Sequence, residues 1–291
     1  LKVIVKKNVK KIIISPLKMQ APNVVEVIDV FLEKGITILT TSNFSEYNAE
    51  TSSVDVRSIQ KIEIQDLLER KEISIDKSEI SKDLFEKVVL ITGSAGSIGS
   101  EIARQVCSFN PKLLIVLDQS ETALFEIKNE IKQLFPKVNF LPFLGDVRNK
   151  ERMEYVISEY KPDVIYHAAA YKHVPMLEDN PVEAIQTNVL GTKNMADLAV
   201  KYKVKKFVMI STDKAVNPAN IMGASKRIAE IYVQSYFRKI SQKENNSTNF
   251  ITTRFGNVLG SNGSVIPIFK RQIEEGGPVK VTHPEIIRYF M

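Results

Sequence analysis

The sequence predicts an α/β protein built on a doubly wound parallel sheet. From residue 87 onward, strand-like apolar runs alternate with segments of helical pattern, and this alternation is typical of a parallel sheet with helices on both faces. A glycine-rich turn follows the first of these runs, and hydroxyl, acidic and basic residues follow later ones. The ends of parallel strands meet at one edge of the sheet, where such proteins bind ligands.

The composition is that of a globular protein without a structural metal or disulfide. The chain has 291 residues, of which 44% are hydrophobic and 25% charged, enough to form one large domain or two modest ones. No apolar stretch approaches the ~18 residues of a membrane-spanning helix. A lone cysteine, Cys107, and three histidines exclude a disulfide framework and a multi-cysteine zinc site. We predict no metal, and Cys107 is expected to be a small core residue.

The net charge of +6 does not indicate a nucleic-acid partner. The lysines gather at 6–11 and 201–206, beside apolar runs that are typical of strands. They fit solvated loops that lead into buried strands, and no basic stripe alternates with aromatic residues.

Residues 1–61 predict a small Rossmann-like α/β unit. A strand is expected at 11–15, a helix from Pro22 to a stop at Gly35, and a second strand at 36–39. Residues 62–86 are predicted to be a linker. Since the chain starts at Leu1 and stops without a closing helix or polar tail, we expect a piece of a longer polypeptide, with the domain at 87–291 truncated at its C-terminal end.

The domain at 87–291 should hold six parallel strands. The apolar runs lie at 88–92, 113–117, 140–143, 164–167, 207–211 and 250–254. Most of the segments between them are long enough for a crossover helix, so the predicted fold is of the Rossmann type.

The strand ends predict a dinucleotide site. Gly93, Gly96 and Gly99 lie between the first strand and a helix, where glycines let backbone N–H groups approach a pyrophosphate. Asp118 ends the second strand and could accept hydrogen bonds from ribose hydroxyls while repelling a 2′-phosphate, which favours NAD over NADP; alternatively it caps the next helix. His167 is expected to be a packed strand-end residue. The full predicted set is Gly93, Ser94, Gly96, Ser97, Ile98, Gly99, Asp118, Asp146, Val147, Ala168, Ala169, Ala170 and Lys226.

A second cluster follows the fifth strand. Thr212, Asp213 and Lys214 supply a hydrogen-bond donor, a proton source and a potential base. Lys226 is expected to open the next helix, with its amine near the nicotinamide ribose. A plain surface turn is the alternative for Asp213 and Lys214.

These motifs resemble one family. The runs TGSAGSIGSE, HAAAYKHVPMLEDNP, STDKAVNPANIMGASKRIAE and RFGNVLGSNGSVIPIF are similar to those of CapD-like polysaccharide-biosynthesis proteins, the UDP-N-acetylglucosamine 4,6-dehydratase branch of the extended short-chain dehydrogenase/reductase superfamily. The resemblance covers about residues 62–291. Residues 1–61 resemble, more weakly, the domain that precedes the catalytic one in the long, membrane-anchored members.

The resemblance implies a lyase that uses NAD. The sugar would be oxidised at C4, Lys214 would remove the C5 proton, Asp213 would protonate the departing C6 hydroxyl, and the hydride would return to C6. Thr212 would bind the 4-hydroxyl, and Lys226 the nicotinamide ribose. Met222 stands where most relatives have a catalytic tyrosine, as is usual in the long branch. An ordered water or Asp213 would then accept the 4-hydroxyl proton.

The resemblance also implies a substrate site and a cellular setting. Positions that match the nucleotide-sugar site are Lys172, Asn188, Asn257, Val265, Ile266, Phe269, Lys270 and Arg288. The expected substrate is a UDP-N-acetylhexosamine, used for capsule or other surface polysaccharide. We expect a homo-oligomer in the cytoplasm, held at the inner face of the membrane only through a missing N-terminal region, and weak nucleotide-sugar binding by these residues alone.

Two other functions fit the same sequence. A nucleotide-sugar 4-epimerase uses the same cofactor and the same C4 oxidation, but it has no need of Asp213 and Lys214 as acid and base. A catalytically silent NAD- or sugar-nucleotide-binding module would agree with Met222.

Overall fold

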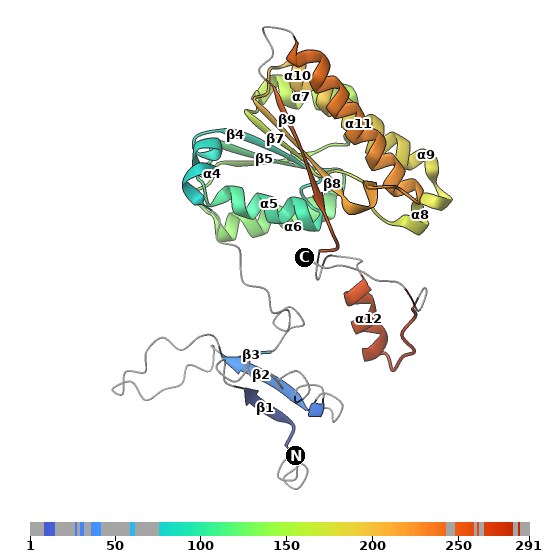
Figure 1. The fold of residues 1–291 in the computed structure, drawn as a ribbon. Coiled ribbons are helices and arrows are strands. Elements are labelled where there is room, and N and C mark those ends of the chain that lie inside the picture. Colours follow the sequence, from blue (N-terminus) through green and yellow to red (C-terminus); the bar gives the residue numbers. More distant parts are fainter. Residues whose placement is uncertain are drawn as a thin grey trace. The chain divides into compact units, whose positions relative to one another are not determined.

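The computed structural model describes residues 9–14, 27, 30–31, 36–41, 59–61, 76–242, 248–258, 261, 265–281 and 285. The chain divides into two compact units, Leu1–Ser74 and Ile75–Met291, and each has its own sheet (Figure 1). The domain boundaries expected at 61 and 86 stay predictions.

The first unit contains a three-stranded sheet. Strand β1 (Lys11–Ile14) pairs in parallel with β2 (Thr37–Thr41), and β3 (Ile59–Lys61) pairs with β2 in the antiparallel direction. Both strands predicted for this unit are therefore present. Most of the predicted helix after Pro22 lies outside the described residues.

The second unit contains the predicted parallel sheet. Its strand order is β6-β5-β4-β7-β8-β9, and all neighbours run parallel. The six predicted strands are confirmed to within one residue at each end. Their bounds are β4 (Val88–Thr92), β5 (Leu113–Asp118), β6 (Phe140–Leu144), β7 (Val164–His167), β8 (Lys206–Thr212) and β9 (Asn249–Phe255).

Helices follow the strands along the chain. They are α4 (Lys77–Leu84), α5 (Ser97–Cys107), α6 (Glu121–Leu134), α7 (Lys150–Tyr160), α8 (Val174–Asp179), α9 (Pro181–Ala184), the π-helix η3 (Ile185–Gly191), α10 (Thr192–Lys201), the 3-10 turn η4 (Asp213–Ala215), α11 (Ile221–Ser241) and α12 (Val265–Glu274). None of them, within the described part of the chain, is both long and apolar enough to cross a bilayer.

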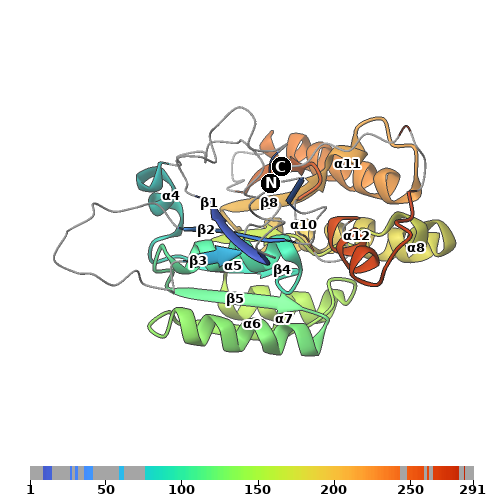
Figure 2. The same cartoon turned by 90° about the horizontal axis from the view of Figure 1, so that it is seen from below.

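Each central strand buries side chains on both faces of the sheet. Val89 of β4 packs with Ala103 of α5, whereas the next residue, Leu90, belongs to the opposite layer with Met153 of α7 and Val233 of α11. In Figure 2, α6 runs alongside β5. Burial on both faces explains why the strands are continuous apolar runs in the sequence.

The strand order reverses beside β4. Helices α5 and α6 cover one face of the sheet, and α7, α10 and α11 cover the other (Figure 1). In open sheets of this kind, such a reversal leaves a crevice at the carboxyl ends of the strands. A ligand is therefore expected among the loops after β4, β5, β6 and β7.

Candidate functional site

The glycine loop is packed so closely that side chains are excluded. Gly93 follows β4 with φ +67°, and a Cβ there would lie 2.5 Å from the backbone nitrogen of Ala169. A Cβ on Gly99 would lie 2.1 Å from the carbonyl oxygen of Gly93. Gly96 is the N-cap of α5 and provides no side-chain cap. The loop therefore presents bare backbone at the start of a helix, where an anionic group is favoured.

A cavity of about 320 Å³ lies against this loop. Loops after β4, β5, β6 and β7 and the π-helix η3 form its walls, so it occupies the expected crevice. The lining residues are Gly93, Ala95, Gly96, Leu117, Asp118, Gln119, Ser120, Ala123, Gly145, Asp146, Val147, Ala168, Ala169, Ala170, Tyr171 and Thr187. Seven of the predicted cofactor residues are among them besides Gly93, and Ser97 and Ile98 form the first turn of α5.

Asp118 joins the glycine loop to the end of β5. Its Oδ2 accepts a hydrogen bond from the Ala95 nitrogen at 3.0 Å, and its Oδ1 accepts one from the Ser120 nitrogen at 2.9 Å. The N-cap of α6 is Ser120, so the alternative that Asp118 caps this helix is wrong. Each carboxylate oxygen keeps a lone pair, and Asp118 lines the cavity, as a ribose-binding residue must.

Asp146 is held by Arg148. The Arg148 Nε donates to Asp146 Oδ2 at 2.8 Å, and Arg148 also binds Glu183 at 2.9 Å. Burial alone would raise the pKa of Asp146, but the hydrogen bonds from Arg148 outweigh burial and lower the pKa. Asp146 is therefore a fixed, ionised carboxylate on the part of the cavity wall that the loop after β6 forms.

His167 is a packed residue, as predicted. It is fully buried, with Thr92 Oγ1 2.8 Å from its Nδ1 and Thr192 Oγ1 3.0 Å from its Nε2. Thr192 donates its own proton to the Asn188 carbonyl, so Nε2 is the protonated ring nitrogen and Thr92 donates to Nδ1. Burial, with a smaller effect of Lys226, lowers the pKa of His167 to about 3. It stays neutral and takes no part in acid–base chemistry.

Two hydroxyl groups near the cavity suggest a polar ligand. Thr187 lines the cavity and Ser94 belongs to the glycine loop, and both side chains are buried. Among the residues that the structure describes, neither hydroxyl has a hydrogen-bond partner. A buried hydroxyl without a partner is unfavourable, and a bound dinucleotide has oxygens that could relieve it. The residues present thus fit NAD, and Thr187 is a cavity-lining residue that the sequence did not reveal.

The second predicted cluster converges at the end of β8. Lys214 Nζ donates to Asp213 Oδ1 at 3.0 Å and to Asn257 Oδ1 at 3.3 Å, and Thr212 Oγ1 donates to Asp213 Oδ1 at 2.9 Å. Burial raises the pKa of Asp213, but Lys214 and Thr212 lower it further than burial raises it. In this geometry Asp213 is an ionised carboxylate paired with the Lys214 ammonium.

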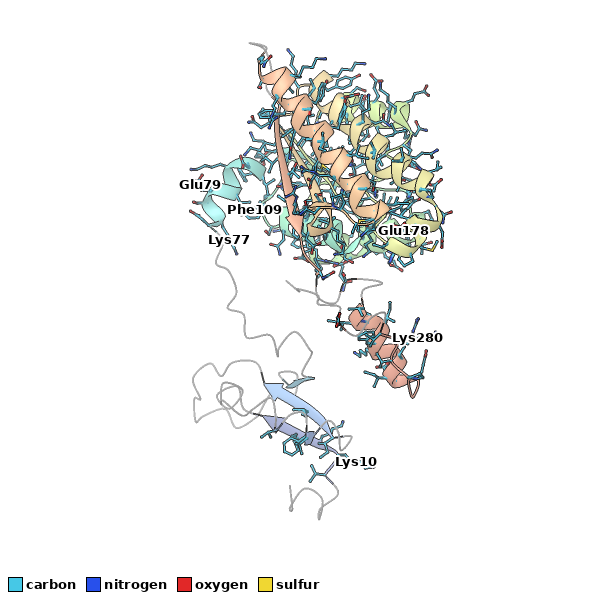
Figure 3. All side chains as sticks on the ribbon, turned by 45° about the vertical axis from the view of Figure 1, so that its right-hand side comes forward. Lys10, Lys77, Glu79, Phe109, Glu178 and Lys280 are labelled. Carbon is cyan, nitrogen blue, oxygen red and sulfur yellow. The ribbon has the colours of Figure 1, made fainter. Side chains whose placement is uncertain are left out.

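Helix α11 lies against this cluster. Asn220 caps the helix through the Gly223 nitrogen at 2.8 Å, and the Glu178 carboxylate, labelled in Figure 3, accepts the Ile221 N–H at 2.8 Å. A Cβ on Gly223 would lie 2.3 Å from the carbonyl oxygen of Lys214. Gly223 was not predicted as a site residue, although a glycine in the first turn of a helix is an indication of close backbone approach.

Met222 and Lys226 are both buried in α11. Met222 packs with Leu177 and Ala184. Lys226 Nζ donates to the Ile210 carbonyl at 2.6 Å, and burial, opposed by Glu230, lowers its pKa to about 8. The expectation that Lys226 opens the helix is wrong, because α11 begins at Ile221. Its contact with the nicotinamide ribose stays a prediction.

The predicted substrate residues differ in their placement. Asn257 joins the Lys214 cluster. Asn188 is buried, and its amide binds the Tyr171 backbone at 2.8 and 3.1 Å and Ser225 Oγ at 2.9 Å. Lys172 is exposed. Val265, Ile266, Phe269 and Lys270 lie on α12, where no described side chain is buried, and Arg288 lies outside the described residues. Their roles stay predictions.

Known proteins resemble this chain along most of its length. The profile of the family described as "Polysaccharide biosynthesis protein" matches residues 89–291. The capsular polysaccharide biosynthesis protein CapD of Staphylococcus aureus is 47% identical over 98% of this chain and 46% of its own length. A UDP-glucose 4-epimerase of Rickettsia canadensis is 39% identical over 71% of this chain and 59% of its own length. A UDP-N-acetylglucosamine 4,6-dehydratase (inverting) of Campylobacter jejuni is 36% identical over 71% and 60%. The chain spans about half the length of the first of these relatives.

Solved structures share the fold. Pen from Bacillus thuringiensis matches with a TM-score of 0.67 and 38% identity, over 72% of this chain and 64% of its own. The UDP-glucose 4-epimerase of Thermus thermophilus, solved in complex with NAD, matches with a TM-score of 0.56 and 28% identity, over 66% and 64%.

Proposed function

Because the chain belongs to the polysaccharide biosynthesis protein family, we propose that it is an NAD-dependent enzyme that modifies a nucleotide sugar for polysaccharide synthesis. The proposed reaction is the 4,6-dehydration of UDP-N-acetylglucosamine or a close relative of it. The observation that carries this proposal is the contact of Lys214 with Asp213 at 3.0 Å, because an elimination needs a base and an acid within reach of adjacent sugar carbons.

The residues of the cavity would hold the cofactor. The glycine loop and the first turn of α5 would receive the pyrophosphate, and Asp118 would accept the ribose hydroxyls. Bound NAD would supply the reversible removal of a hydride from C4 of the sugar. The relative solved with NAD supports this assignment.

The Lys214–Asp213 pair can provide both catalytic forms from its resting state. A proton that crosses the 3.0 Å hydrogen bond converts ammonium and carboxylate into a neutral amine and a carboxylic acid. A bound substrate would exclude water and favour this neutral pair, because burial disfavours charged forms. No proton has to enter or leave the pair at this point.

The elimination then restores the ion pair. Once C4 carries a ketone, the C5 proton is acidic and Lys214 Nζ removes it. Asp213 gives its proton to the C6 hydroxyl, the C6–O bond breaks and water leaves with a C5–C6 double bond formed. Lys214 ends as ammonium and Asp213 as carboxylate. Return of the hydride to C6 and of a proton from Lys214 to C5 would then complete the 4-keto-6-deoxy sugar. Met222 has no basic atom, so a water molecule accepts the proton of the 4-hydroxyl during the oxidation. Asp213 could accept that proton only if it had not already taken the one from Lys214.

A 4-epimerase is the second candidate, because one relative with that name has a similar identity to this chain. Proton NMR of the protein with NAD and UDP-N-acetylglucosamine in heavy water separates the two. A new C6 methyl signal with deuterium at C5 is the expected result. A C4 epimer without a methyl signal would establish the epimerase instead.

Two substitutions test the residue roles. Asp213→Asn and Lys214→Ala should each abolish the methyl product while the protein still binds NAD. Product formed at the normal rate by either variant would refute the acid and base roles of these two residues. No turnover by the unaltered protein that nonetheless binds NAD would favour a different hexose or a silent binding module.

A further inference from the structure

A buried carboxylate lies one helical turn beyond Lys226. The Glu230 side chain in α11 is 0% exposed. Arg254 of β9 binds it through two nitrogens, Nε to Oε1 at 2.9 Å and an NH2 group to Oε2 at 2.6 Å. Arg227, from the same helix as Glu230, adds a contact at 3.1 Å. A fork of this kind fixes orientation as well as distance.

The carboxylate is ionised in this position. Burial raises the pKa of Glu230, but hydrogen bonds from Arg254 and Arg227 outweigh burial and lower the pKa. A buried ion pair contributes little net stability compared with apolar side chains of similar volume. The position of the pair in the fold therefore says more about its role than its contribution to stability does.

The pair connects the three elements that carry the catalytic cluster. Ser211 and Arg254 are register partners on β8 and β9. Ser211 directly precedes Thr212, Asp213 and Lys214 in the chain, and Arg254 precedes Asn257 after β9. Glu230 and Lys226 occupy the same helix. The Glu230 carboxylate thus connects the end of β9 to α11. The residue after β9 that contacts Lys214 is Asn257, and α11 packs on the Lys214 backbone.

We propose that Glu230 and Arg254 are positioning residues that hold Asn257 and Lys214 in register with α11. The catalytic roles of Asn257 and Lys214 rest on the proposed function. The positioning itself does not, since it concerns only how β9 is fastened to α11.

Arg227 offers a matched control for Arg254. Both guanidinium groups contact Glu230 Oε2, and their side chains are 40% and 38% exposed respectively. Arg227, however, connects Glu230 only to its own helix. If Glu230 merely needs positive charge nearby, the two arginines are equivalent. If the pair positions β9, only Arg254 is needed.

The experiment compares Arg254→Lys with Arg227→Lys, since lysine keeps the charge and loses the fork. For Arg254→Lys we expect kcat to fall about 10- to 100-fold, the effect of misplacing a catalytic group by up to about 1 Å, with KM for the nucleotide sugar within about threefold. For Arg227→Lys, kcat should stay within about twofold, because this contact joins two residues of the same helix and fastens no other element to it. Hydrogen exchange at 211–214 and 255–257 should accelerate in Arg254→Lys alone.

The outcomes separate this inference from the proposed function. Equal kcat and equal exchange in the two variants would overturn the positioning role. If the unaltered protein forms no dehydrated sugar, the proposed reaction fails, yet the exchange data still decide the positioning. Glu230→Gln, which keeps the shape and loses the charge, should reproduce the Arg254→Lys pattern, and a normal kcat in that variant would also contradict the proposal.

Discussion

Gly223→Ala should separate catalysis from stability. The substitution adds one methyl group in the first turn of α11, at the point where the helix meets Lys214. The added Cβ would lie 2.3 Å from the Lys214 carbonyl oxygen, whereas ordinary contacts begin at 3.4 Å. Because the obstacle is backbone, no side-chain rotation relieves it, and Lys214 and α11 must separate by about 1 Å.

The expected effects on stability and on rate are of different size. Alanine gains at most about 1 kcal/mol over glycine in a helix, and overpacking costs about 1–3 kcal/mol. The free energy of unfolding should therefore change by no more than about 2 kcal/mol. A displacement of about 1 Å at a catalytic group reduces the rate by about 100-fold, so kcat should fall by that factor.

The assay combines chemical unfolding with the rate of product formation by NMR. Ser235→Ala, on the exposed face of the same helix, is the control, and it should leave both quantities nearly unchanged. If Gly223→Ala folds with normal stability and retains full kcat, the close approach of α11 to Lys214 does not position the base. If the variant does not fold, the glycine is needed for stability rather than for the position of Lys214.

Three further predictions concern the cavity and its surroundings. Thr187→Val should stabilise the protein without NAD by about 1 kcal/mol, because it removes a buried hydroxyl that has no partner among the described residues. It should also weaken NAD binding about fivefold. Thermal melting measures the first effect and calorimetric titration the second, and an unchanged NAD affinity would contradict a contact between Thr187 and the cofactor. Asp118→Asn should raise the affinity for NADP relative to NAD by about tenfold, since a like charge next to a 2′-phosphate is removed; a titration that shows the old preference would refute it. His167 has a pKa of about 3 in the folded protein against 6.5 when exposed, so below pH 6.5 the unfolded chain binds a proton that the folded protein does not. The free energy of unfolding should therefore decrease by about 1.4 kcal/mol for each pH unit below 6.5. In urea unfolding, His167→Gln should lack this dependence between pH 6.5 and 5, and equal slopes in the two proteins would count against a neutral buried imidazole.

The strands were predictable because their signal is local. Strands buried on both faces are continuous apolar runs, and polar residues interrupt them at each end. The glycine loop, Asp118 and the Thr212–Lys214 segment lie at such ends, so their convergence followed from the parallel topology. For the same reason His167 could be predicted as a packed residue at the end of β7.

Other parts of the site depend on contacts between distant segments. The amine of Lys226 binds the Ile210 carbonyl, which no spacing in α11 indicates. Asn188 is held by the Tyr171 backbone and Ser225. The Thr187 hydroxyl has no hydrogen-bond partner within the described part of the chain, and this depends on which distant segments pack around it. Helix α4 was missed because its sequence is largely polar, with Leu84 its one buried residue.

The kind of obstacle at each glycine decides whether a second mutation can rescue its loss. Alanine at Gly93, Gly99 or Gly223 meets backbone atoms first, and trimming a neighbouring side chain frees no space there. Alanine at Gly191 meets the Val147 Cγ2 atom at 2.7 Å. A selection for suppressors of Gly191→Ala should therefore recover Val147→Ala. No comparable suppressor is expected for the other three glycines, so these three positions should be kept as glycine in any variant library.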